Sequence, residues 1–413
     1  MSRAPVGLAL AVAATLCACA PWGSEDLGAL GDAPVYSAVS AGLSRTCGIG
    51  AGGTAYCWGQ ATLGTQQATG LCSGPPNPDP NYVVPDVECV MRPIVVSGGH
   101  HFASLATGPN VTLAVDEAGA VWGWGVNFYG LLGTFREDSI VDYPRQVVGT
   151  ETWHFTSIAV SYTTACGVTD DHRLVCWGDK NLVTSGVPTT CAASNAACGT
   201  AAAQVGSGTT WVQVVVGDEH ACALDTSGAV YCWGNGAKGQ LGSTPLASCP
   251  GGMFGGAVPC RTVPTKVSGT AVYTSLSAAG TFTCGITSTT ALLCWGTIGT
   301  ATFGTPLAYT NLSGWTAVAV GGYDIQGNAV CGIRTGGTLW CFGPSQLGGG
   351  NVHQVSVSAT LIGVTVGGGH ACGWDSAGTA WCFGDNSYGS LGTGALSPAY
   401  NAVVVAVSNP FRD

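Results

Sequence analysis

The chain has 413 residues, a formal net charge of −10 and only 8% charged residues. With 12 lysines and arginines it offers no basic surface for nucleic acid or for anionic lipid. Its 65 glycines, together with abundant valine, threonine, alanine and serine, favour short strands joined by tight turns over helices.

The N-terminus has the pattern of an export signal. Arg3 precedes an apolar stretch, residues 6–16, that is too short to span a bilayer. The segment Leu16-Cys17-Ala18-Cys19 resembles a bacterial lipobox, and this resemblance implies that Cys19 becomes the lipidated first residue of the mature protein. The alternative is cleavage after an Ala-x-Ala site at residues 18–20, which would release a freely secreted protein.

From this pattern we expect three segments: a signal peptide over residues 1–19, a tether over residues 20–33, and a folded domain over residues 34–413. The expected location is the bacterial cell envelope, lipid-anchored at the outer membrane or in the periplasm, or the extracellular medium. The membrane is then contacted only through the N-terminal lipid.

Cysteines recur in pairs ten residues apart, and this spacing occurs six times: Cys47 with Cys57, Cys166 with Cys176, Cys222 with Cys232, Cys284 with Cys294, Cys331 with Cys341, and Cys372 with Cys382. A seventh copy has Leu113 and Gly123 at the two positions, so both cysteines are missing together. Joint loss is expected for the two halves of one disulfide. Export to an oxidising compartment also favours disulfides.

Six further cysteines fall two by two in three long segments between the repeats: Cys72 with Cys89, Cys191 with Cys198, and Cys249 with Cys260. With Cys17 and Cys19 in the signal, no cysteine is left over. Zinc is the competing interpretation, but no pair has Cys-x2-Cys spacing and no histidine follows at ligand distance.

Each pair, and the copy without cysteines, is followed by an aromatic residue and a glycine. The aromatic anchors are Trp58, Trp124, Trp177, Trp233, Trp295, Phe342 and Phe383. The shortest separation, 41 residues between Phe342 and Phe383, matches the length of a four-stranded propeller blade.

Within one unit the strands can be placed in order. The first strand spans residues 211–216 and its counterparts begin at Tyr36, Phe102, Phe155, Tyr273, Trp315 and Leu361. A second strand starts at Cys222, an Asp-Thr-Ser-Gly turn follows at residues 225–228, and a third strand ends at Trp233. Hairpin geometry brings the two cysteines within disulfide reach, although a bridge between neighbouring units remains an alternative. A fourth strand led by proline comes last, as at Pro144 and Pro264.

After the anchor, several units carry a Gly-x-Leu-Gly sequence, as in Gly239-Gln240-Leu241-Gly242 and Gly389-Ser390-Leu391-Gly392. Together with the Trp-Gly anchor and with Gly217-x-x-His220, this pattern resembles the regulator of chromosome condensation repeat over residues 34–407. The resemblance implies an all-β fold, a seven-bladed β-propeller. The hairpin cysteines depart from the family pattern and suit an exported branch.

The C-terminal strand is expected to close the ring. The first unit has no proline-led strand before it, and the last unit is followed by a spare strand at residues 398–407. If this strand docks beside the N-terminal unit, it completes a blade and covers an exposed sheet edge.

Most polar residues with catalytic potential occupy repeated positions, which predicts structural roles. These sets are His220 and His370; Asp116, Asp225 and Asp375; and Trp122, Trp340 and Trp381. Outside the pattern stand His100-His101, Asp170-Asp171-His172 and Asp218-Glu219, and none has the spacing of a metal or catalytic motif. We therefore assign no catalytic residue, no metal and no cofactor.

The strongest functional signal is where the insertions fall. Residues 65–93, 184–206 and 243–262 follow the same motif in three units, and each holds a cysteine pair. Equivalent connections of a ring emerge on one face, so these loops predict a recognition surface. The candidate binding residues are Tyr82, Tyr129, Phe254 and Tyr388. The alternative is decoration that protects the ring from proteolysis.

Known members of the resembled family include guanine-nucleotide exchange factors bound to chromatin and secreted inhibitors of β-lactamase. Export and negative charge argue against the first role. We expect a monomeric binding module for a protein or cell-surface ligand. The rival class is a polysaccharide-acting hydrolase or lyase with its site in the central funnel, and a third is a structural surface protein without a specific ligand.

Overall fold

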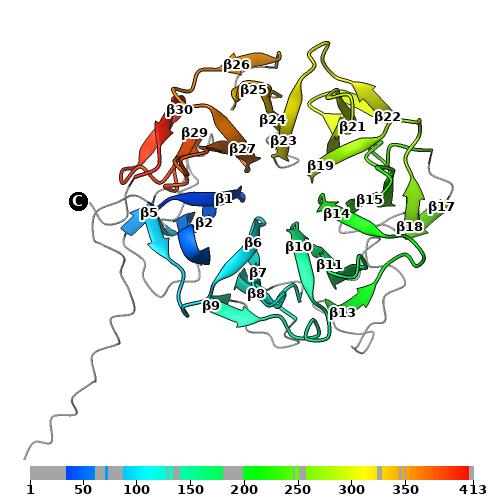
Figure 1. Cartoon of the computed structure of the whole chain (residues 1–413), viewed down its shortest axis with the longest axis horizontal. Coiled ribbons are helices and arrows are strands. Elements are labelled where there is room, and N and C mark those ends of the chain that lie inside the picture. The colour runs from blue at the N-terminus through cyan, green and yellow to red at the C-terminus, as the bar shows by residue number, and fades with distance from the viewer. Residues whose placement is uncertain are drawn as a thin grey trace, which may run out of the picture.

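The computed structural model describes residues 34–60, 70–72, 87–127, 130–133, 140–179, 199–244, 247–250, 257–322, 328–343, 347 and 350–408. Seven antiparallel sheets stand around a common centre as the blades of a propeller (Figure 1). The predicted all-β, seven-bladed fold is confirmed. In the described parts of the chain no helix is long and apolar enough to cross a membrane.

The first strand of each blade lies at the centre of the ring (Figure 1). All seven begin at the residue from which the sequence predicts this strand, and that residue is buried in every blade. The inner strands of blades one to seven are β1 (Tyr36–Ala41), β6 (Phe102–Thr107), β10 (Phe155–Val160), β14 (Trp211–Val216), β19 (Tyr273–Ala279), β23 (Trp315–Gly321) and β27 (Leu361–Val366).

The second and third strands form the central hairpin of each blade. The second strands are β2 (Arg45–Gly50), β7 (Val111–Asp116), β11 (Thr164–Thr169), β15 (His220–Asp225), β20 (Phe282–Thr287), β24 (Ala329–Arg334) and β28 (His370–Asp375). The third strands are β3 (Ala55–Gln60), β8 (Val121–Val126), β12 (Leu174–Asp179), β16 (Val230–Asn235), β21 (Leu292–Ile298), β25 (Thr338–Phe342) and β29 (Ala380–Asn386). In blade one the hairpin turn is the short 3-10 segment η1 (Ala51–Gly53).

The hairpin register places paired cysteines directly opposite each other. In blade four, Cys222 faces Cys232 with 4.1 Å between their Cα atoms, and the two form a disulfide. The other five predicted hairpin bridges have the same Cα separation of 4.1 Å, and they join Cys47 to Cys57, Cys166 to Cys176, Cys284 to Cys294, Cys331 to Cys341, and Cys372 to Cys382. Every one lies within its own hairpin, so the alternative of a bridge between neighbouring blades is wrong.

The outer strands are β5 (Val87–Val95), β9 (Ile140–Gln146), β13 (Gly199–Gln204), β18 (Ala257–Lys266), β22 (Ala301–Ala308), β26 (His353–Val355) and β30 (Ser397–Ala406). The expectation that proline leads this strand is wrong for β9 and β18, where Pro144 and Pro264 lie inside the strand. Both prolines fall where the register shifts against the third strand. Such a bulge tolerates the missing N–H.

The C-terminal strand does not dock beside the N-terminal unit as expected. Strand β30 pairs with β29 and completes blade seven, with Val405 opposite Cys382. Blade one supplies its own outer strand, with Ile94 of β5 opposite Cys57, so its edge is already occupied. The ring closes instead by packing of β1 against β27 and β28.

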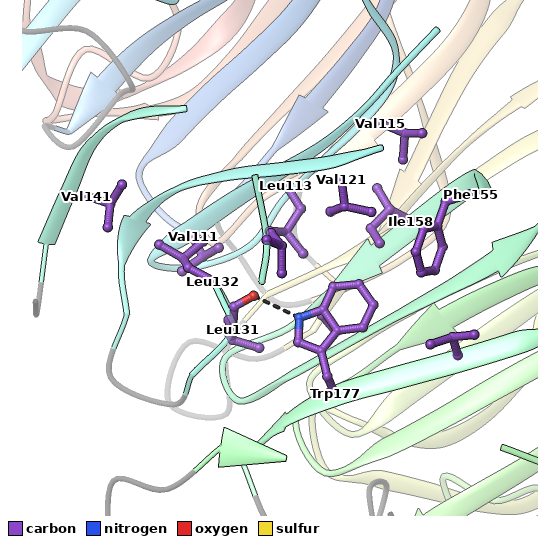
Figure 2. Packing of buried hydrophobic residues seen from close by; sticks show 13 residues of the cluster. Val111, Leu113, Val115, Val121, Leu131, Leu132, Val141, Phe155, Ile158 and Trp177 are labelled. Carbon is purple, nitrogen blue, oxygen red and sulfur yellow. Dashed lines mark hydrogen bonds between the residues drawn. The ribbon is translucent and has the colours of Figure 1, made fainter. Parts of the chain in front are cut away.

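Blade two, which lacks the hairpin disulfide, fills that space with leucine. Leu113 is fully buried, and a methyl group on Gly123 would lie 2.8 Å from Cδ2 of Leu113. Figure 2 shows how this core continues into blade three, where Nε1 of Trp177 donates a hydrogen bond of 2.8 Å to the carbonyl oxygen of Leu131. The aromatic anchor of one blade thus packs on the Gly-x-Leu-Gly loop of the blade before it.

Candidate binding face

One face of the ring carries two kinds of connection in every blade. Because the strands are antiparallel, the turns from first to second strand and the connections from third to outer strand leave the sheet at the same end. We call this the cavity face, because a central cavity of about 340 Å³ opens there. The ends of all seven inner strands line that cavity.

Glycine backbones form the rim of the cavity. A methyl group on Gly42 would lie 2.4 Å from the carbonyl oxygen of Gly108, and one on Gly367 would lie 2.1 Å from that of Gly42. A methyl group on Gly217 would likewise lie 2.6 Å from the carbonyl oxygen of Gly280. Neighbouring turns are therefore packed too closely for a side chain, which explains the glycine that follows most first strands in the sequence.

The cavity wall is polar, and its polar groups join the blades. At the fifth position of the inner strand, the hydroxyl oxygens of three residues each accept a hydrogen bond from a backbone N–H of the next blade. These bonds are Thr107 N–H to Ser40 at 2.9 Å, Val320 N–H to Ser277 at 2.8 Å and Ala41 N–H to Thr365 at 3.0 Å. Between blades four and five, Gln213 both donates to the carbonyl and accepts from the N–H of Leu276.

Asp218 is the one titratable residue among the described residues that line the cavity. Glycoside hydrolysis commonly uses two carboxyl groups on either side of the scissile bond. The described part of the cavity wall does not supply such a pair, so the geometry gives the funnel-enzyme interpretation no support.

Further out on the cavity face, two insertions extend the sheets of blades one and four. Strand β4 (Gly70–Cys72) pairs with β5, and β17 (Ala247–Pro250) pairs with β18, each as a fifth, outermost strand. Disulfides hold both additions, Cys72 to Cys89 and Cys249 to Cys260.

These two insertions are built in the same way. Cys89 lies opposite Gln60, and Cys260 lies opposite Asn235. Gln60 and Asn235 are the last residues of their third strands, at the cavity face. Two separate insertions therefore place a disulfide at the same register position.

Of the predicted binding residues, the structure describes Tyr388. It lies half-buried between β29 and β30, and burial, with a smaller effect of the nearby Asp385 carboxylate, raises the pKa of its phenol. The other candidates, Tyr82, Tyr129 and Phe254, lie outside the described residues, as do Cys19, Cys191 and Cys198.

The repeated aspartates have the structural role in the hairpin turn that the sequence predicts for them. Asp116 accepts hydrogen bonds from the N–H groups of Ala118 and Ala120 through Oδ1, and from Nε1 of Trp122 through Oδ2. Asp375 repeats this arrangement with Trp381.

The residues outside the repeat pattern lie on the opposite face, apart from Asp218 and Glu219. His100 packs on the ring of Trp122, with centroids 3.9 Å apart, and burial lowers its pKa. Asp171 is exposed and pairs with Arg173, whose hydrogen bond lowers the pKa of that carboxyl to about 2. Within the described ranges no three His, Cys, Asp or Glu side chains are grouped so as to hold a metal ion.

Comparison with known families identifies the repeats. The model of the regulator of chromosome condensation (RCC1) repeat matches residues 118–168 and 227–292, and a second model of the same repeat matches residues 211–240. The segments that these models match, residues 118–168 and 211–292, are RCC1 repeats. Propellers of this kind commonly mediate protein binding.

Curated relatives match part of the chain. The ultraviolet-B receptor UVR8 of Arabidopsis thaliana is 25% identical over 205 residues, which is 49% of this chain and 42% of the receptor. Protein pim1 of Schizosaccharomyces pombe is 26% identical over 152 residues, 34% of this chain and 28% of pim1. The match thus spans less than half the length of these relatives.

Solved structures share the fold across most of the chain. Human WBSCR16 superimposes with a TM-score of 0.67 and 18% identity, over 86% of this chain and 95% of that one. Prp20p of Saccharomyces cerevisiae superimposes with a TM-score of 0.65 and 16% identity, over 91% of this chain and 88% of Prp20p. Prp20p is described with its binding to Gsp1p and histones and has also been solved with Kap60. At these identities the likeness shows the fold alone.

Proposed function

We propose that the chain is an exported, lipid-anchored binding module that recognises a protein or a cell-surface ligand through its disulfide-held loops on the cavity face. The observation that carries this proposal is the equivalent placement of the Cys72–Cys89 and Cys249–Cys260 bridges at the same face and register of two blades.

The described edge strands β4 and β17, each held to its neighbour by a disulfide, suit recognition for an entropic reason. A loop already ordered by a disulfide loses little conformational freedom when a ligand binds, so more of the contact energy remains as affinity. Leu71, next to Cys72, is 64% exposed, and Val263, three residues after Cys260 in β18, is 62% exposed. Such side chains add contact area at a protein interface.

Export is supported by the chemistry of the cysteines. Disulfides persist in oxidising compartments and are rare in the cytosol, and the eight bridges of the described residues would have little purpose in a reducing environment. The lipobox-like segment ending at Cys19 then accounts for both transport and anchoring. The resembled family includes exchange factors bound to chromatin and secreted inhibitors of β-lactamase. Because the disulfides favour export, the secreted inhibitors are the closer parallel to this chain.

The test is ligand capture by the full exported chain, followed by chemical crosslinking and mass spectrometry to locate the contact. We expect crosslinks on the cavity face. The double variants Cys72→Ser/Cys89→Ser and Cys249→Ser/Cys260→Ser, which free the insertions and keep the hairpin bridges, should weaken capture. Glu117→Gln, on the opposite face, serves as the matched control. Crosslinks confined to the opposite face, or unchanged capture by both double variants, would refute the proposal.

A further inference from the structure

Blades one and seven meet at a seam that no peptide connection bridges, because they hold the two ends of the ring (Figure 1). Polar contacts are dense there. Ser390 of blade seven offers its carbonyl oxygen to two donors of blade one, Nε1 of Trp58 at 2.8 Å and the hydroxyl of Thr46 at 3.0 Å. The same hydroxyl lies 2.7 Å from Nε2 of His370.

This arrangement fixes the tautomer of the neutral imidazole. The Thr46 hydroxyl has one proton and donates it to Ser390, so it must accept from Nε2–H of His370. The neutral ring therefore carries its proton on Nε2. A second proton would go to Nδ1, which lies against the backbone of Gly367: a methyl group there would be 3.0 Å from Nδ1.

The groups around His370 do little to stabilise a positive charge. From β29 and its following turn, the carboxylate of Asp385 favours the charged ring, and Tyr388 is half-buried beside Asp385. From β2, the cation Arg45 precedes Thr46. The residues at 367–369 are glycines. The imidazole is 1% exposed, and burial outweighs Asp385, so the pKa of His370 falls to about 4.

A matched contact exists inside the ring. Between blades four and five, Nε2 of His220 lies 2.7 Å from the hydroxyl of Thr283, and burial lowers the pKa of His220 to about 3. Those two blades are consecutive in the chain and remain tethered when the contact breaks. At the seam, the contacts between the described residues of the two blades are all non-covalent.

We propose that the interface between blades one and seven is acid-sensitive, and that the ring opens there when His370 is protonated. Opening separates the apolar surfaces packed across the seam, including Tyr36, Trp58 and Leu391. It would give an exported protein a second state in acidic surroundings, with a new surface available for contact.

The direction of the pH effect on ring opening follows from the lowered pKa of His370. The closed ring holds His370 neutral down to about pH 4, whereas an exposed histidine takes up its proton near pH 6.5. The closed state is therefore fully favoured above pH 6.5 and loses stability as the pH falls toward 4. With these two values the open-to-closed ratio rises about 30-fold between pH 8 and pH 5.

The test is hydrogen exchange of the full chain between pH 8 and pH 5, corrected for the intrinsic pH dependence of exchange. We expect protection of seam peptides, residues 36–50 and 361–375, to fall about 30-fold. No loss of protection at the seam overturns the proposal without requiring any variant.

Two variants then assign the effect to one side chain. His370→Gln keeps an N–H donor toward Thr46 but does not titrate, so it should remove the pH dependence of exchange at the seam. His220→Gln should leave that dependence unchanged. An acid response that persists in His370→Gln, or that disappears in His220→Gln, contradicts the assignment.

Discussion

The indole of Trp58 lies on the backbone of Gly392, so closely that a methyl group on this glycine would be 2.9 Å from Nε1. Between blades four and five, a methyl group on Gly242 would lie 3.1 Å from Nε1 of Trp295 in the same way. Two motifs that look independent in the sequence, the Trp-Gly anchor and the Gly-x-Leu-Gly loop, are thus the two sides of one contact between neighbouring blades.

Replacing Gly392 by alanine should destabilise the ring for two reasons. The backbone at Gly392 has φ +66°, which disfavours any side chain, and the added methyl group collides with Trp58. We expect a loss of about 2–4 kcal/mol in the free energy of unfolding, measured by denaturant titration.

Gly99→Ala is the matched control, because Gly99 has φ +62° and nothing within 4 Å of the added methyl group. It should lose only the backbone part, about 1 kcal/mol. Equal losses for the two variants would show that the contact with Trp58 contributes nothing.

The sequence predicts the elements that rest on local chemistry. Asp225 and Gly228 define a hairpin turn by themselves, and the ten-residue spacing then places Cys222 opposite Cys232. Ring closure was predicted wrongly because strand pairing depends on which edge is free. Pro93, Ile94 and Val95 have the proline-led pattern of a fourth strand, and they occupy the edge of blade one that the C-terminal strand was expected to cover.

Two residues occupy a backbone conformation that glycine holds in the other blades. Among the described residues, only His172 and Thr290 have positive φ without being glycine, at 63° and 61°. Both end the hairpin turn and accept, through their carbonyl oxygens, the N–H of the first residue of the next blade, as Gly228 does for Tyr273. The contact between blades imposes this conformation.

Thr290→Gly should therefore stabilise the protein by about 1 kcal/mol, because a β-branched residue is strained at positive φ. The hydrogen bond from Gly314 N–H to the Thr290 hydroxyl, at 3.1 Å, is lost and reduces the gain. Thermal unfolding measures the change. The reverse variant Gly228→Thr should lose stability, and a gain there would contradict the argument.

Two tyrosines begin inner strands with buried hydroxyls that have no hydrogen-bond partner among the described residues, Tyr36 and Tyr273. Burial raises the pKa of both, that of Tyr273 to about 12. Blades two and three have Phe102 and Phe155 at the same position. A phenylalanine therefore fits this site.

Tyr36→Phe and Tyr273→Phe should leave the protein unchanged or stabilise it by about 1 kcal/mol, because each removes a buried polar group without a partner. Denaturant titration of each single variant measures this, with Phe155→Tyr as the opposite change, which should destabilise. If either phenylalanine variant loses more than about 1 kcal/mol, its hydroxyl makes a stabilising contact.

The candidate face was predictable in part. The three insertions with paired cysteines are visible in the sequence, and two of their bridges are at the cavity face. The hydroxyl contacts of Ser40, Ser277 and Thr365 were not predictable. These residues look like ordinary strand residues, and their partners lie in other blades, so no local pattern marks them.

Blade two can be tested for the missing seventh bridge. Leu113 and Gly123 lie opposite each other in the register that the cysteines occupy elsewhere. A methyl group on Gly123 would meet Cδ2 of Leu132 at 2.4 Å, the end of a flexible side chain. The equivalent leucines of blades four and seven, Leu241 and Leu391, are buried beside intact disulfides, so Leu132 can adopt a compatible position.

The double variant Leu113→Cys/Gly123→Cys should therefore form a disulfide, seen as a linked peptide in non-reducing peptide mapping. The free energy of unfolding should change by no more than about 1 kcal/mol, because the stabilisation from closing a short loop, about 2–3 kcal/mol, is offset by a loss of leucine packing of about 2 kcal/mol or more. The single variant Gly123→Cys should destabilise, since Leu113 still fills the space. Free thiols at both positions of the double variant would mean that the leucine core of blade two, and not the shared hairpin geometry, decides which blades can be bridged.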